Sequence, residues 1–226
     1  HHSLAKLDES LRARGGRLTI RRGGSLETLL AVARETGATH VYWNRLYDPA
    51  RVAHDTQVKA ALREAGLHCD SFNAALLHEP WEVRTGQGDP YRVFTPFWKS
   101  CAARLDALPR PLAAPDRLPA PPALVAGLAL EELELRPRIR WDAGLHEAWT
   151  PGEAGALAQL ESFASGTIAR YSDGRNRPDL PETSRLSPHL HFGEVGPRQC
   201  LAAARNAVAD RPSSQGSADS FVRELG

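Results

Sequence analysis

Three hydroxyl side chains lie within five residues of one another, at Thr183, Ser184 and Ser187. Arg185 stands among them and either adds a cation or pairs with a nearby acid. Pro188 follows Ser187, the usual order of a helix cap and a first helical residue. Hydroxyls, a guanidinium and the unpaired N–H groups of a helix start all suit a phosphate or pyrophosphate. For an isolated Ser-Pro, a plain cap is the more common role.

The N-terminal part of the chain, which precedes this segment, alternates between helical and strand patterns. Helices are predicted from Ser3 to Gly15, from Ser25 to Ala33 with Ser25 as cap, and from Pro49 to Ala65. Strands are predicted at Arg17–Arg21, Thr39–Trp43 and Leu67–Phe72. This order predicts right-handed parallel crossovers and an α/β fold with a doubly wound parallel sheet. Three strands are few for such a sheet, so we expect one or two founding strands upstream of residue 1.

The sequence predicts three domains or segments. Residues 1–80 form the N-terminally truncated α/β domain, 81–145 a connector, and 146–226 the start of an all-α domain. The connector includes a linker, Pro109–Pro122, in which the density of proline makes a continuous helix unfavourable. Thr150–Glu153 matches a capping box with Pro151 as first helical residue, and Ser217 is the expected cap of a last helix.

Composition sets further bounds on the class of protein. The chain has 226 residues, 28 of them basic and 27 acidic, so its net charge of +1 neither favours nor opposes nucleic acid. The three cysteines are too far apart for a zinc knuckle or a disulfide framework, which favours a reducing, cytoplasmic setting. No apolar run is long enough to span a membrane. The arginines at 136, 138 and 140 form either a solvated edge or an approach to DNA phosphates.

Three ordered motifs resemble the DNA photolyase and cryptochrome family. Thr183–Pro188, followed by His189–Cys200, resembles the family's flavin-phosphate region. Arg92–Trp98 is similar to its interdomain segment. Trp43–Arg45, together with Asp55, resembles the strand and following helix of its antenna domain. Because the motifs occur in the family's order and span most of the chain, their joint specificity is high.

The resemblance implies which residues bind which group. FAD is the implied cofactor, and its ribityl-diphosphate portion would contact six residues. They are Tyr171, Thr183, Ser184, Arg185, Leu186 and Ser187. Arg175 matches a position near the DNA-binding face. A folate antenna is disfavoured, because the positions that match the family's asparagine and acid are Ala50 and Arg51, and the antenna chromophore stays open.

The resemblance also implies an activity. We expect a monomeric, light-driven deoxyribodipyrimidine photo-lyase, of the class I type, that splits cyclobutane pyrimidine dimers in damaged DNA. The family's residues around the flavin ring would follow Gly226, so the chain alone is expected to be inactive and to retain FAD weakly. A cryptochrome-type light sensor is one alternative, and a generic nucleotide-binding α/β module is another. No metal site is expected, since His189 and His191 have no third ligand nearby.

Overall fold

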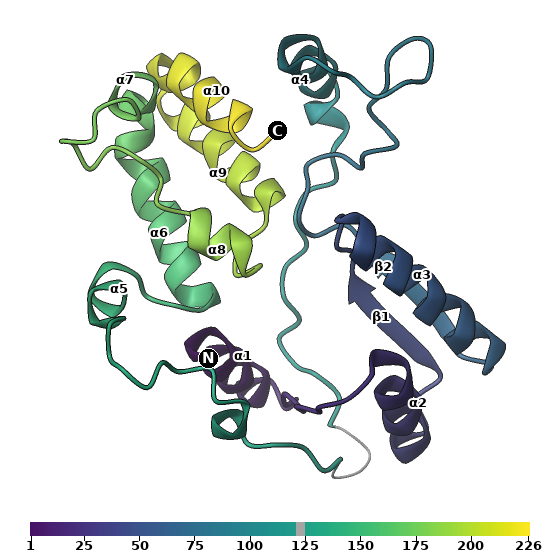
Figure 1. Ribbon diagram of the computed structural model, residues 1–226. Helices are drawn as coiled ribbons and strands as arrows, with labels where there is room; N and C mark the ends of the chain where they lie inside the picture. Colours follow the sequence, from purple (N-terminus) through teal and green to yellow (C-terminus); the bar gives the residue numbers. More distant parts are fainter. Residues whose placement is uncertain (121–124) are drawn as a thin grey trace. The chain divides into compact units, whose positions relative to one another are not determined.

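The structure is a computed structural model and describes residues 1–120 and 125–226 (Figure 1). Contacts divide the chain into two compact units, each built from two stretches of sequence. Unit 1 comprises His1–Asn73 and Ala114–Gly152, and unit 2 comprises Ala74–Ala113 and Glu153–Gly226. The end of the expected linker, Pro121 and Pro122, lies outside the described residues. The three continuous domains expected from the sequence stay a prediction.

Unit 1 contains a parallel pair of strands, β1 (His40–Asn44) and β2 (His68–Phe72), in register from His40 opposite His68 to Asn44 opposite Phe72. A helix connects the two strands, as parallel pairing requires. The helices of this unit are α1 (His2–Ala13), α2 (Ser25–Thr36), α3 (Pro49–Glu64), the 3₁₀ helix η2 (Leu130–Leu133) and α5 (Ala143–Ala148). The parallel α/β character of the fold class is confirmed.

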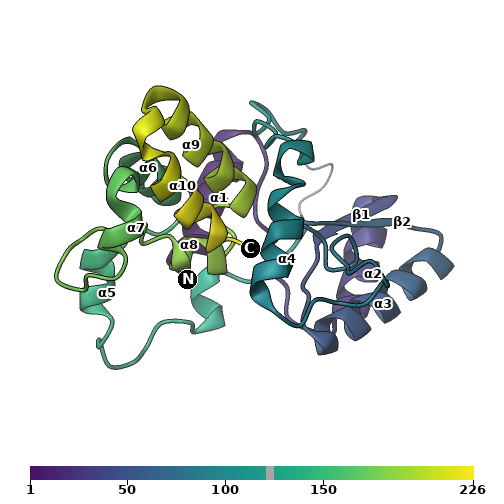
Figure 2. The same cartoon turned by 90° about the horizontal axis from the view of Figure 1, so that it is seen from above.

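One face of the strand pair is covered by α2 and α3, which lie on the same side of it (Figure 2). Val58 and Leu62 of α3 pack with Cys69 of β2, and leucines of α2 add to this cluster. Alternate residues on the opposite face, from His40 and Tyr42 to Phe72, are exposed. The period-2 pattern of a strand thus separates a buried face from a polar and aromatic one.

The prediction of a strand at Arg17–Arg21 is wrong. The segment has no regular secondary structure. Single backbone hydrogen bonds join it and the residues before it to the chain near Leu118 and Leu128: Leu118 N–H donates to Arg14 O at 2.7 Å, and Leu128 N–H donates to Ile20 O at 2.9 Å. Leu18 N–H donates instead to Asp8 Oδ1, a bond that lowers the pKa of Asp8 together with Arg12. Alternation of apolar residues suggested a strand. A strand, however, needs a neighbouring strand whose carbonyl groups accept hydrogen bonds from its successive backbone N–H groups.

Unit 2 is helical throughout its regular structure. Its helices are α4 (Phe94–Ala102), η1 (Leu105–Ala107), α6 (Glu153–Ser165), η3 (Thr167–Arg170), α7 (Tyr171–Gly174), α8 (Ser187–His191), α9 (Pro197–Asp210), η4 (Pro212–Ser214) and α10 (Gln215–Arg223). α6, α7, α9 and α10 lie side by side (Figure 1). This part of the chain shows the helical character expected to follow the α/β region.

The core of unit 2 is centred on three aromatic rings from different helices. Phe163 of α6 lies 4.7 Å from Phe221 of α10 and 5.6 Å from Tyr171 of α7, between ring centroids. Tyr171 and Phe221 are 5.5 Å apart and nearly perpendicular. Edge-to-face pairs of this kind contribute beyond the area they bury. Leu186, which is fully buried, belongs to the same cluster.

Several helix starts differ from the predicted caps. Gly24, not Ser25, occupies the N-cap of α2, and Gly37 ends the helix in a left-handed conformation. α6 begins at Glu153, after Pro151, because Gly152 has a φ of +97°. α10 begins at Gln215, so Ser217 is an internal, buried helical residue. Each difference shifts the helix start by one to three residues, which is usual for helix ends predicted from sequence.

We expect Phe163→Ala to lower the free energy of unfolding by about 3 to 5 kcal/mol, because it removes the ring on which Tyr171 and Phe221 pack. Leu157→Ala on the same helix is the matched control, since Leu157 is 42% exposed, and should cost at most about 1 kcal/mol. Urea unfolding followed by circular dichroism measures both. Equal losses would contradict the assigned core.

Candidate phosphate-binding site

The hydroxyl-rich segment comprises the end of the loop between α7 and α8 and the first residue of α8, Ser187. It presents a polar surface over a buried leucine, Leu186. Thr183, Arg185 and Ser187 are exposed, Ser184 is half-buried, and Leu186 is completely buried. No hydrogen bond within the described residues engages the hydroxyl of Thr183 or Ser187. The Ser184 hydroxyl accepts a long bond, 3.5 Å, from Leu186 N–H. Two hydroxyls are therefore free to bind a ligand.

Contacts from neighbouring helices fix the position of this segment. Gln159 of α6 donates through Nε2 to Ser184 O at 3.0 Å. Arg170 Nε lies 2.5 Å from Glu182 Oε1. Glu182 also packs over Gly174, where a Cβ would collide with it. Because a main-chain carbonyl, a buried leucine and an ion pair hold the segment, its hydroxyls gain a defined position that loops commonly lack.

Arg185 has a left-handed backbone, with a φ of +54°. A side chain in this region costs about 1 kcal/mol or more, so glycine is the residue that fits it best. The conformation persists because Ser184 on one side and Leu186 on the other are both held. Strain of this kind often accompanies a functional role of the side chain that it retains.

The helix that begins at Ser187 is short, and its N-cap differs from the predicted one. α8 has five residues, its N-cap position is Leu186, and no side chain caps it. The prediction that Ser187 caps the helix is therefore wrong, because Ser187 is itself the first helical residue. A helix of one and a half turns carries little dipole, so the hydroxyls and the arginine are the groups that this segment offers to a phosphate.

Tyr171 occupies the aromatic core, and only 8% of it is exposed. Burial raises the pKa of its hydroxyl, so the group stays protonated and able to donate well above neutral pH. Its predicted contact with a ribityl-diphosphate group stays a prediction. The Gly174–Glu182 contact connects the Tyr171 helix to the segment that starts at Thr183.

Arg175 follows α7 and pairs with Glu224 near the end of α10. Its guanidinium carbon lies 5.6 Å from the centroid of the Tyr171 ring, within reach of a cation–π contact. The hydrogen bond to Glu224 raises the pKa of Arg175, which keeps the side chain charged. Its expected role near DNA is a prediction, and a phosphate there would compete with Glu224.

Sequence reasoning missed two residues that hold the candidate site, Gln159 and Glu182. Glu182 lies next to Thr183, and the crowding of polar residues around it was a usable signal. Gln159 lies 25 positions away from Ser184, and its bond to a carbonyl depends on tertiary folding. No local pattern could have identified it.

The antenna-like motif also comes together in unit 1. Trp43 Nε1 donates to Asp55 Oδ2 at 3.1 Å, and Lys59 Nζ lies 5.8 Å from the centroid of the Trp43 ring. Asn44 pairs in register with Phe72 at the carboxyl ends of the strands, the usual place for ligands of an α/β sheet. Two of the matched residues, Trp43 and Asp55, are therefore in direct contact.

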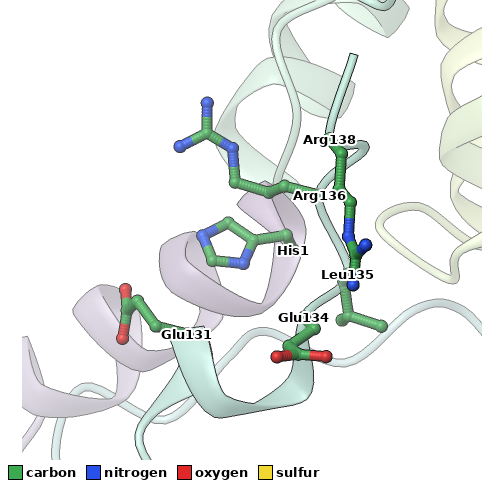
Figure 3. A pocket seen from close by; sticks show the side chains of 6 residues that line it. All are labelled: His1, Glu131, Glu134, Leu135, Arg136 and Arg138. Carbon is green, nitrogen blue, oxygen red and sulfur yellow. The ribbon is translucent and has the colours of Figure 1, made fainter. Parts of the chain in front are cut away.

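A separate pocket in unit 1 is lined by residues of both charges (Figure 3). Arg136 and Arg138 stand beside it with Glu131 and Glu134, and His1 and Leu135 complete the lining. None of the predicted site residues belongs to it. The carboxylates reduce the attraction of this surface for phosphate, which favours a solvated edge for these arginines.

The described residues also bear on metal binding and on membrane insertion. Within residues 1–120 and 125–226, no three His, Cys, Asp or Glu side chains gather in a way that could hold a metal ion. No helix in the described parts of the chain is both long and apolar enough to cross a membrane.

The fold and donor groups are those of a protein with a parallel α/β unit, a helical unit and a segment suited to phosphate. A family model for DNA photolyase matches residues 1–121. The chain belongs to the DNA photolyase family. This confirms the resemblance to the family, and two of the three motifs, Trp43–Arg45 and Arg92–Trp98, lie within the matched residues. The family assignment also replaces the alternative of a generic nucleotide-binding module.

Named relatives and solved structures agree with this membership. The chain is 43% identical to a deoxyribodipyrimidine photo-lyase of Agrobacterium fabrum, over 87% of this chain and 41% of that protein. It is 36% identical to cryptochrome-1 of Arabidopsis thaliana, over 90% of this chain and 30% of that protein. It also matches the crystal structure of a class III photolyase from Agrobacterium tumefaciens, with 39% identity and a TM-score of 0.95, over 100% of this chain and 46% of that one. The chain thus spans less than half the length of these relatives.

The strain at Arg185 gives a testable pair of variants. Arg185→Gly and Arg185→Ala both remove the side chain, but only glycine relieves the left-handed backbone. We expect Arg185→Gly to exceed Arg185→Ala in free energy of unfolding by about 1 kcal/mol. Ala158→Gly in the exposed interior of α6 is the control and should destabilise by about 1 kcal/mol. Urea unfolding measures the free energies of unfolding of all three variants. An alanine variant as stable as the glycine variant would show that the backbone at Arg185 is not strained.

Proposed function

We propose that this chain forms part of a light-driven, FAD-dependent deoxyribodipyrimidine photo-lyase, and that Thr183–Ser187 binds the diphosphate of FAD. The observation that carries the proposal is a segment with outward hydroxyls and an arginine, fixed from beneath by Leu186 and from the side by Gln159. Membership of the DNA photolyase family makes FAD the expected ligand. The relatives named photo-lyase support DNA repair as the activity.

The donor set fits a diphosphate. Hydroxyl groups and a guanidinium donate hydrogen bonds to anionic oxygens, and such charge-assisted bonds are stronger than neutral ones. Thr183 and Ser187 have hydroxyls that are exposed and not engaged by the described part of the chain. Leu186 points into the core instead, so its contribution is to hold the segment and to offer main-chain groups.

The remaining roles follow from the same proposal. Reduced, light-excited FAD would supply the electron that opens a cyclobutane pyrimidine dimer flipped out of damaged DNA. Arg175 would contact a DNA phosphate, with Glu224 orienting it before DNA binds. The protein would act as a monomer in the cytoplasm.

A cryptochrome-type light sensor is the second candidate function. The chain is 36% identical to two Arabidopsis thaliana proteins named cryptochrome-1 and cryptochrome-2, which is close to its identity with several photo-lyases. Both functions use the same proposed flavin site, so the structure of that site does not separate them.

A spectrum and a repair assay separate the two candidates. We expect the natural protein, purified with all the sequence that its gene encodes, to show flavin absorbance and to repair dimer-containing DNA under blue light but not in the dark. Bound flavin without repair would favour the sensor. The absence of flavin would contradict both.

The proposed diphosphate contacts predict an effect of single hydroxyl groups. Thr183→Ala and Ser187→Ala should each weaken FAD binding about tenfold, because each removes a hydrogen bond to a charged group. Ser162→Ala, which removes an exposed hydroxyl from α6, is the control and should have no effect. Dissociation constants from flavin fluorescence titration test this. Unchanged affinity in both site variants would remove this segment from the FAD site.

A further inference from the structure

The turn between α8 and α9 ends α8 in a Schellman motif. Gly193 is left-handed, with a φ of +69°, and its N–H donates to Leu190 O at 3.2 Å. Glu194 N–H donates to His189 O at 2.8 Å. These two reversed bonds define the motif, in which the side chains at the positions of His189 and Glu194 frequently form a hydrophobic contact.

In this protein the contact is polar. His189 Nδ1 lies 2.5 Å from Glu194 Oε2, and the two side chains are only 3% and 7% exposed. Burying such a pair requires the removal of water from both groups, and well-packed apolar residues often stabilise a protein equally or better. Stabilisation of the helix end therefore does not explain why these two residue types are present.

The geometry of α8 connects this pair to the candidate site. Residues two apart on a helix point about 200° from each other, so a side chain held inward at His189 directs Ser187 outward. Ser187 is indeed exposed and His189 buried. A helix of five residues is too short to hold its own conformation, so its orientation depends on what fixes it at each end. Leu186 fixes the first end, and the His189–Glu194 pair fixes the second.

We propose that His189 and Glu194 are positioning residues for the phosphate-binding hydroxyl of Ser187. A short, directional hydrogen bond restricts the rotation of α8 about its axis more narrowly than an apolar contact does. The inference rests on the proposed function, since Ser187 is assigned to the FAD diphosphate there. It adds two residues that touch no ligand and act through the helix.

The test replaces the polar pair by an apolar one. In the natural protein with all its encoded sequence, His189→Leu with Glu194→Leu supplies the usual hydrophobic contact of the motif. We expect the melting temperature to be equal or higher, while FAD affinity falls about tenfold through misplacement of one hydrogen bond. His189→Asn keeps a nitrogen where His189 has Nδ1, and it should retain most of the affinity.

Each outcome decides a different point. Wild-type FAD affinity in the double leucine variant, at equal stability, would overturn the positioning role. A wild-type protein that binds no FAD would overturn the proposed function instead. Amide hydrogen exchange of residues 183–190 without ligand then tests the pair directly. Faster exchange in the double leucine variant than in the wild type supports positioning, and equal exchange overturns it.

Discussion

Phe163, Tyr171 and Phe221 come from three helices of unit 2 and meet ring against ring. This contact determines how α6, α7 and α10 pack, and the loop that leaves α7 must return over the same core. The loop contacts the apolar cluster again at Leu186, which is part of that cluster. The polar residues on either side of Leu186, Arg185 and Ser187, consequently face solvent. The candidate site is thus a consequence of where one leucine is buried.

A phosphate-binding segment must combine two properties that oppose each other. Its donors must be exposed, and exposed loops gain conformational entropy when they move. The structure resolves this by fixing the main chain and leaving the hydroxyls free. Gln159 binds the carbonyl of Ser184, and Glu182 joins the loop to Arg170. Affinity for an anion then requires less ordering upon binding, which is the advantage of preorganisation.

The sequence predicted the parts of this arrangement that depend on local chemistry. The two parallel strands and the helix between them follow from periodicity, and the hydroxyl-rich segment follows from residue type. The strand at Arg17–Arg21 could not be judged locally, since a strand exists only through its neighbour. Two helix starts were misplaced because Gly152 has a φ of +97°, so that α6 begins after it, and because Leu186 takes the N-cap position of α8. Gln159 was missed because 25 residues separate it from Ser184.

Two features near Ser187 depart from the choices that local stability would favour. Arg185 keeps a left-handed backbone where glycine would fit better, and the end of α8 contains a buried polar pair where apolar residues would suffice. Departures of this kind concentrate where function limits the sequence. They lie on opposite sides of the same hydroxyl, one preceding it and one following it. A structural role alone would have to explain each departure separately, whereas the anion proposed to bind at Ser187 would account for both.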